Sequence, residues 1–263
     1  MRRAGWPGGP LTRWQRLLAA RRRWLKPWRS YQRRLRRHGD REAPLARIAA
    51  VDGLISEEEA WLLYSLAAGA RDGCVVEIGS YRGRSTVALA LGARAGNGGP
   101  VYAVDPMVEY TGPLGFQYGR GDKTRLLLNL LLAGVAESVW LLQTTSAAAA
   151  ATWSQPIALL WIDGDHSYEA VRADVESWTP FLIPGGIVAF DDSTRGEWGV
   201  ARVVGKMLER GEYERVGLVG KVSVLRRTGA ARSKAAGERE PVLEARGTRW
   251  PAAPSAASQR HGR

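Results

Sequence analysis

The 263-residue sequence contains one cysteine, Cys74, and only three histidines. A single cysteine cannot form an internal disulfide, which excludes a disulfide-stapled secreted scaffold, and we expect a buried thiol in a reducing compartment. The sequence also lacks an apolar run long enough to cross a bilayer and a cleavage pattern that follows a hydrophobic core. We therefore expect neither a membrane span nor a secretory signal, and we predict a cytoplasmic protein.

Positive charge is concentrated at the two ends of the chain. Residues 1–47 contain 15 Lys and Arg against two Asp and Glu, a net charge of +13, and residues 227–263 contain eight against three, a net charge of +5. Residues 48–226 contain 15 against 21, so the middle of the chain is mildly acidic. We predict a basic helical extension over 1–47, one folded domain over 48–226 and a disordered basic tail over 227–263.

The basic extension leaves three interpretations open. Its apolar residues form a rough helical stripe among arginines, and Pro27 interrupts it; the stripe comprises Leu11, Trp14, Leu18, Leu25 and Trp28. The helix caps the core or pairs with a second subunit in a homo-oligomer, or it lies on the anionic inner surface of a membrane as a peripheral contact. Nucleic-acid binding is the third interpretation, and we do not expect it because a basic run without a recognised fold is weak support.

Two strand-like runs in residues 159–193 end in acidic residues. One apolar run stops at Asp163, which is followed by Asp165 and His166, and the other stops at Asp191 and Asp192. Between them lies a segment with apolar residues at helical spacing, so the unit is predicted to be strand, helix and parallel strand. The three strand-end acids therefore meet at the carboxyl edge of the sheet, where open α/β sheets bind ligands.

A glycine turn follows an earlier predicted strand over 74–78. The turn runs through Gly79 and Gly83 and opens a helix, and a second strand over 101–104 ends at Asp105, which is placed to bind ribose hydroxyls. The dinucleotide pattern GxGxxG and the triphosphate pattern GxxxxGK[ST] are both absent. These features favour a cofactor with a ribose and a small anionic end, a description that S-adenosylmethionine fits.

The turn EIGSYRGRS at 77–85, Asp105 and the acidic strand ends resemble those of class I S-adenosylmethionine-dependent methyltransferases. The resemblance covers about residues 56–226 and is greatest to metal-dependent O-methyltransferases of the catechol type and to related enzymes that methylate sugars. It implies an α/β fold with a doubly wound, mostly parallel, seven-stranded, Rossmann-like sheet. The sheet would end in a C-terminal antiparallel hairpin, which we place at 213–218 and 221–225.

The resemblance also implies roles for individual residues. Three acids would bind a divalent metal, expected to be magnesium: Asp163, Asp191 and Asp192. His166 would be the catalytic base. Cofactor contacts are implied for Glu77, Gly79, Tyr81, Gly83, Ser85, Asp105 and Ser146, with Glu77 near the amino group, Asp105 on the ribose and Ser146 near the adenine. The loop over 107–123 is the candidate lid or acceptor loop.

These residues predict an S-adenosylmethionine-dependent O-methyltransferase in which a divalent metal activates a substrate hydroxyl. The expected acceptor is a small molecule with neighbouring oxygens, such as a sugar or a specialised metabolite. The alternative is a noncatalytic protein on the same fold that binds a membrane or a partner through its basic helix. A third hypothesis is metal-dependent hydroxylation, which an oxygen requirement would distinguish from methyl transfer.

Overall fold

The computed structural model describes residues 29–37, 43–96, 99–112, 115, 117–119, 121–196 and 199–228. The apolar stripe over 11–28 and the basic tail from 229 onward lie outside these residues. Among the described residues, no helix combines the length and apolarity needed to cross a membrane. The described residues belong to one compact unit.

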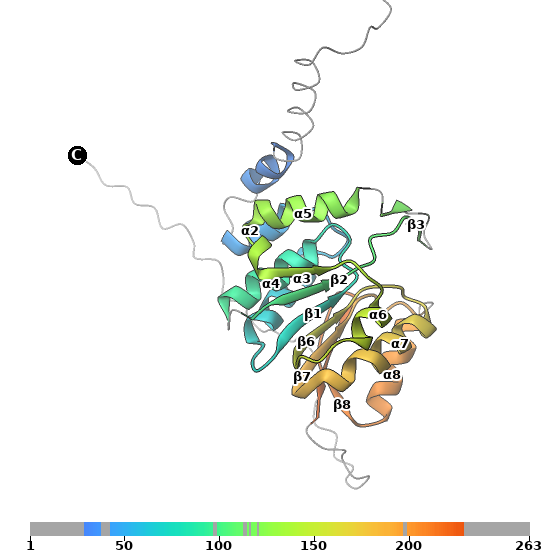
Figure 1. Ribbon diagram of the computed structural model, residues 1–263. Coiled ribbons are helices and arrows are strands. Elements are labelled where there is room, and N and C mark those ends of the chain that lie inside the picture. Colours follow the sequence, from blue (N-terminus) through green and yellow to red (C-terminus); the bar gives the residue numbers. More distant parts are fainter. Residues whose placement is uncertain are drawn as a thin grey trace, which may run out of the picture. The chain divides into compact units, whose positions relative to one another are not determined.

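Seven strands form one sheet in the order β5-β2-β1-β6-β7-β9-β8 (Figure 1). The strands are β1 (Cys74–Ile78), β2 (Val101–Val104), β5 (Val139–Leu142), β6 (Ile157–Ile162), β7 (Leu182–Phe190), β8 (Tyr213–Val219) and β9 (Val222–Arg227). The first five run parallel to one another, and β9 is antiparallel to both β7 and β8. The predicted fold class, including its C-terminal hairpin, is confirmed.

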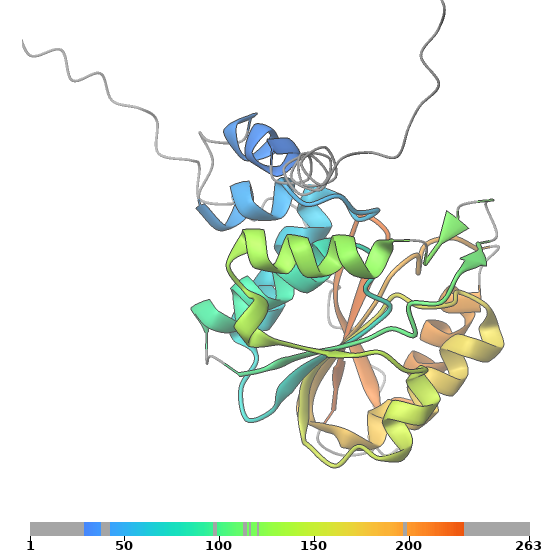
Figure 2. The ribbon, with the colours of Figure 1, turned by 45° about the horizontal axis from the view of Figure 1, so that its top comes forward.

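Helices cover both faces of this sheet (Figures 1 and 2). One face is covered by α2 (Ala43–Ala49), α3 (Glu57–Gly69), α4 (Arg84–Ala95) and α5 (Asp122–Ala133), and the other by α6 (Ser146–Ala151), α7 (Tyr168–Trp178) and α8 (Gly199–Glu209). Two short 3-10 helices, η1 (Ala136–Ser138) and η2 (Thr179–Phe181), and a small hairpin of β3 (Tyr110–Thr111) and β4 (Gln117–Tyr118) complete the described elements.

Alternation along β6 explains why the core has two halves. Leu159 and Trp161 pack with the helices of one face, whereas Leu160 and Ile162 pack with those of the other. A strand buried on both faces reads as an unbroken apolar run, as the segment before Asp163 does. The single cysteine, Cys74, is buried in the same way, and burial raises its pKa to about 11, so the thiol stays protonated.

The parallel register brings the acidic strand ends to one level. Ile78 of β1 is paired with Ile162 of β6, which is paired with Phe190 of β7. The ladder continues one residue further, because Asp163 N donates to Ile78 O over 2.9 Å and Asp191 N donates to Ile162 O over 3.0 Å. On the other side, Gly79 N donates to the last carbonyl of β2 over 2.9 Å.

A capping box connects α3 to the turn between β8 and β9. The Ser56 hydroxyl accepts from Glu59 N over 3.1 Å, and Glu59 Oε2 accepts from Ser56 N over 2.7 Å, as the sequence pattern predicts. The other carboxylate oxygen, Oε1, accepts from Lys221 N over 3.0 Å. One buried glutamate thus satisfies a helix start and fixes the backbone of a distant turn.

The helix over residues 29–37 is attached to the domain through one side. Tyr31 is buried, Leu35 packs against the core, and the Arg34 guanidinium donates to the Ala50 carbonyl and pairs with Asp52 at 2.9 Å. Arg125 of α5 pairs with the same aspartate at 3.2 Å. These contacts leave the other side of the helix, with its remaining arginines, exposed to solvent.

Candidate active site

The glycine turn after β1 passes so close to β6 that a side chain does not fit. Gly79 has a φ of 84°, and a Cβ there would lie 2.1 Å from the Asp163 carbonyl oxygen. Gly83, with a φ of 86°, is the N-cap of α4. The turn therefore opens the crevice between β1 and β6, the position where the strand order reverses and ligands bind.

Asp105 holds the glycine turn to the end of β2. Its Oδ2 accepts from Ser80 N over 2.9 Å and from Tyr81 N over 3.2 Å, and its Oδ1 accepts from Met107 N over 2.8 Å. Tyr81 has a φ of 45°, an uncommon backbone conformation for a residue other than glycine. The structure thus brings together two predicted cofactor residues, Tyr81 and Asp105.

Glu77 lies beneath this turn with one oxygen that accepts no hydrogen bond from a described residue. The Thr86 hydroxyl donates to Glu77 Oε2 over 2.6 Å, and the Ser80 and Ser85 hydroxyls lie near the carboxylate, whose buried Oε1 has no described partner with good hydrogen-bond geometry. Burial raises the pKa of Glu77 to about 7, and hydrogen bonds from neighbouring hydroxyls, including that of Ser85, oppose the rise. An ammonium or a hydroxyl at the turn would satisfy these groups.

Ser146 is placed at the start of α6, but its hydroxyl already has two partners. It donates to Asp174 Oδ1 and accepts from Trp178 Nε1 over 2.8 Å. Both partners belong to α7, so the hydroxyl connects two helices of the same face. The hydroxyl therefore has no proton left to donate to an adenine, although its oxygen can accept one further hydrogen bond.

Asp163, His166 and Asp191 converge at the carboxyl edge of the sheet. One ligand atom from each lies within 4.8 Å of the others, and His166 Nε2 is 3.5 Å from Asp163 Oδ1. Asp192 lies on the opposite side of the imidazole, with Oδ2 3.6 Å from His166 Nδ1 and Oδ1 3.0 Å from Arg195 Nε. Its φ of 49° is a second strained backbone position in the site. Two of the three predicted metal ligands thus lie with the predicted base, and the third flanks it.

Lys221 enters this acid cluster, although the sequence reasoning assigned it no role. Its Nζ lies 2.6 Å from Asp191 Oδ2 and 3.3 Å from Asp192 Oδ1. The predicted C-terminal hairpin could have indicated this contact. Because β9 is antiparallel to β7, the residue that precedes β9 lies beside the residues that follow β7. The cluster is therefore three carboxylates, one imidazole and one ammonium.

Burial dominates the electrostatics of the cluster. It raises the pKa of Asp163 to about 8 and that of Asp191 to about 9; mutual repulsion between the carboxylates adds to both shifts, and Lys221 opposes them. Burial also lowers the pKa of His166 against the opposing effect of Asp192 and Asp191. Asp191 Oδ1 is buried and accepts no hydrogen bond from a described residue. A divalent cation would relieve both the repulsion and the unsatisfied oxygen.

Tyrosines of the small hairpin lie against the glycine turn. The Tyr110 and Tyr118 rings stack with centroids 4.8 Å apart, and Tyr118 meets the Tyr81 ring edge-on at 5.3 Å. Burial raises the pKa of Tyr110 to about 12, and the fields of Tyr118, Asp105 and the acid cluster add to this shift. The described part of the predicted lid loop thus places two stacked aromatic rings beside the cofactor turn.

The raised pKa of Glu77 predicts a stability that depends on pH. The carboxyl group binds its proton more tightly in the folded chain than in the unfolded chain, so its contribution is fully present below pH 4.5 and is lost as the pH rises toward about 7. Glu77→Gln has no carboxyl group to titrate, so the melting temperature of the variant should rise relative to that of the wild type as the pH increases from 4.5 to about 7. Glu176→Gln, at an exposed position of α7, is the control, and parallel curves for Glu77→Gln and wild type would contradict the shift.

Residues 76–193, which contain the glycine turn, Asp105 and the acidic strand ends, match a family model described as a methyltransferase domain. Similar solved structures include the cofactor-bound protein Rv0187 from MTB, at 23% identity and a TM-score of 0.52 over 71% of this chain and 88% of that one. Another is an O-methyltransferase from Bacillus cereus in complex with SAH, at 16% identity and a TM-score of 0.50 over 71% and 92% of the two chains.

A third similar structure is the O-methyltransferase NovP, at 17% identity and a TM-score of 0.55 over 66% of this chain and 81% of that one. At these identities the likeness shows the fold alone, and the family model covers the segment that contains the glycine turn, Asp105 and the acidic strand ends. The chain therefore has the α/β fold of these solved structures, and its residues 76–193 match the methyltransferase-domain family model.

Proposed function

We propose that the chain transfers a methyl group from S-adenosylmethionine to a hydroxyl oxygen of a small molecule whose neighbouring oxygen chelates a divalent metal. The observation that supports this proposal most directly is the convergence of Asp163, His166 and Asp191 opposite the glycine turn at one sheet edge. NovP and the Bacillus cereus protein are described as O-methyltransferases, which is consistent with an oxygen acceptor. The acceptor class is a sugar or a specialised metabolite with adjacent oxygens.

The cofactor half of the proposal uses the groups around the glycine turn. The unsatisfied oxygen of Glu77 supports the methionine ammonium, while Gly79 and Gly83 allow the backbone of the turn to approach it. Ser85, in the first turn of α4, contributes its hydroxyl beside Glu77. Asp105 keeps acceptor capacity for ribose hydroxyls, since each carboxylate oxygen has two lone pairs. Its existing bonds to the turn fix its orientation before the cofactor binds.

The metal half of the proposal places magnesium on Asp163 and Asp191, with Asp192 as the flanking carboxylate. Oxygen ligands and retained waters suit this ion, and the buried, unsatisfied Asp191 Oδ1 offers a ligand atom. Bound magnesium supplies a Lewis acid that lowers the pKa of a chelated hydroxyl. His166 acts on the same hydroxyl as general base, because its lowered pKa keeps the imidazole neutral and able to accept a proton near neutrality.

The noncatalytic alternative is less well supported. A vestigial pocket has no need for strained residues or for several buried acids, yet the chain keeps Tyr81 and Asp192 in the left-handed region and Glu77 without a full set of partners. Such features are costly, and they concentrate where a ligand compensates for them.

Asp163→Asn should separate metal binding from cofactor binding. The amide removes one charge from the cluster, so magnesium affinity should fall by about 100-fold, while S-adenosylmethionine affinity should change little because the cofactor groups lie on β1 and β2. Titration calorimetry with each ligand in turn measures both affinities, with Glu176→Gln as an exposed control. Wild-type protein that binds neither S-adenosylmethionine nor S-adenosylhomocysteine would refute the proposed function.

His166→Gln tests the proposed base. With a panel of catechols and sugar nucleotides as acceptors, the rate of S-adenosylhomocysteine formation should fall by about 10²- to 10⁴-fold for an acceptor that the wild type methylates. The wild-type rate should also decline as the pH falls and the imidazole becomes protonated, and the variant should lose that inflection. A variant that retains the full rate across neutral pH removes His166 from the base role.

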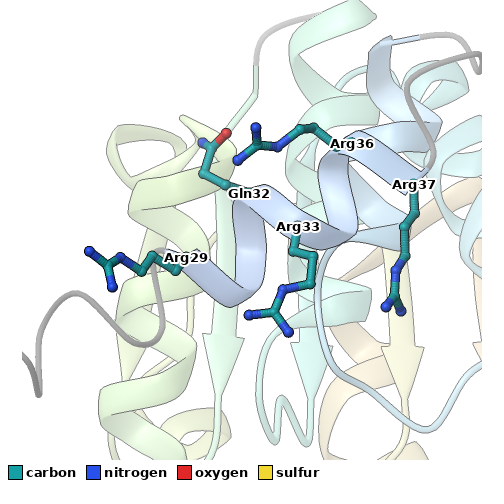
Figure 3. Close-up of a pocket in the computed structure, with 5 residues that line it drawn as sticks. All are labelled: Arg29, Gln32, Arg33, Arg36 and Arg37. Carbon is teal, nitrogen blue, oxygen red and sulfur yellow. The ribbon is translucent and has the colours of Figure 1, made fainter.

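We also propose that the exposed side of the helix over 29–37 contacts an anionic lipid surface. Its arginines line a hollow of about 680 Å³ with Gln32, and Figure 3 shows these side chains extending from one helix; they are Arg29, Arg33, Arg36 and Arg37. Within the described residues, no acidic side chain pairs with these four. The preceding sequence combines arginine with tryptophan and leucine, a composition that suits a lipid interface better than a nucleic-acid groove.

Vesicle binding should depend on this arginine face. Sedimentation with vesicles that contain phosphatidylserine should recover the wild-type protein, and vesicles of phosphatidylcholine alone should not. Arg33→Glu with Arg36→Glu should abolish recovery, whereas Arg210→Glu with Arg215→Glu, an equal change of net charge at exposed positions elsewhere, should not. If both double variants lose vesicle recovery equally, the effect is one of net charge and not of this helix face. If the wild-type protein binds duplex DNA and is not recovered with vesicles, the partner is a nucleic acid and the lipid proposal is wrong.

A further inference from the structure

The backbone of Lys221 is held on both sides of its α-carbon. Its N–H donates to Glu59 Oε1 over 3.0 Å, and its carbonyl oxygen accepts from the Ser193 N–H and the Ser193 hydroxyl, each over 2.9 Å. Ser193 directly follows the Asp191-Asp192 pair, and its hydroxyl oxygen also lies 2.8 Å from the hydroxyl oxygen of Ser223 of β9, which can donate to it. The lysine is therefore fixed to the strand end whose carboxylates it contacts.

The ammonium of Lys221 and a divalent metal need the same carboxylates. Nζ lies 2.6 Å from Asp191 Oδ2 and 3.3 Å from Asp192 Oδ1, and its side chain is only 21% exposed. A metal held by Asp163 and Asp191 would lie a few ångströms from this ammonium in a region that is only partly exposed to water. Repulsion between like charges at such a separation is strong when solvent does not screen it.

We propose that Lys221 is an internal counter-cation that competes with the divalent metal for Asp191 and Asp192 and thereby weakens metal binding. The lysine neutralises part of the cluster in the metal-free enzyme, and its flexible four-carbon stem lets the ammonium move away when the metal binds. The backbone contacts to Glu59 and Ser193 keep it close enough to return. This inference rests on the metal site of the proposed function, and it assigns to Lys221 a positioning role rather than a catalytic one.

Magnesium and manganese titrations of the full-length chain test this competition. Lys221→Gln should bind both metals about tenfold more tightly than the wild type, because the competing charge is gone. Lys221→Arg keeps the charge and should bind as weakly as the wild type. Lys206→Gln, an exposed lysine of α8 whose Nζ contacts the Tyr168 hydroxyl, should also bind like the wild type.

Several outcomes would overturn the proposal. Unchanged or weaker metal binding by Lys221→Gln would show that the ammonium does not compete, provided that thermal denaturation shows a folded variant. Lys221→Met, which keeps an apolar stem, repeats the comparison if the glutamine variant does not fold. Tighter binding by Lys221→Arg would also contradict a charge effect.

The test separates this inference from the proposed methyl transfer. Titration of the same variants with S-adenosylmethionine reports on the cofactor half, which Lys221 does not touch. Tighter metal binding by Lys221→Gln in a chain that binds no S-adenosylmethionine would sustain the counter-cation and refute the methyltransferase proposal. Normal S-adenosylmethionine binding with unchanged metal affinity in Lys221→Gln would refute the counter-cation and leave the methyltransferase proposal standing.

Discussion

The parallel hydrogen-bond ladder of β1, β6 and β7 is the constraint on which the site depends. Because the ladder continues for one residue beyond each strand, the first residues after the three strands lie in one row. Two of them, Asp163 and Asp191, are acids, and the third is Gly79, whose missing side chain leaves room for the Asp163 carbonyl. A one-residue change of register would separate the acids and close the crevice.

The acids of this row repel one another, and other residues at the same edge of the sheet offset that repulsion. Carboxylates that lie close together under partial burial disfavour their charged forms, which is why the pKa values of Asp163 and Asp191 are raised. Two cations and an imidazole surround these carboxylates. Lys221 of the β8–β9 turn contacts Asp191, Arg195 pairs with Asp192, and His166 lies between Asp163 and Asp192. The antiparallel hairpin thus does more than extend the sheet, because it delivers the cation that this acidic edge needs.

The fold and the strand-end acids could be predicted because local patterns determine them. Unbroken apolar runs identify strands that are covered on both faces, and parallel connection places the ends of such strands together, so the sequence alone assigns Asp163 and Asp191 to one edge. The capping box at Ser56 could be predicted for the same reason, because it joins residues only three positions apart in the sequence. Contacts between distant side chains were harder to predict: the predicted hairpin brings Lys221 near the end of β7, but no local pattern shows that its ammonium reaches Asp191. Likewise, nothing near Ser146 in the sequence indicates that α7 engages its hydroxyl. Those contacts depend on how elements pack, which periodicity does not encode.

Strain is divided between the two halves of the crevice. Tyr81 in the cofactor turn and Asp192 in the acid cluster each have a positive φ, and each is fixed by contacts with a different strand end. Tyr81 N is held by Asp105, and the turn after Asp192 is held through Ser193 and Lys221. Because separate contacts fix the two strained residues, we expect the sheet to position the two halves independently. Binding at one half can therefore change without rebuilding the other, which is the physical basis for measuring cofactor and metal affinity as separate quantities.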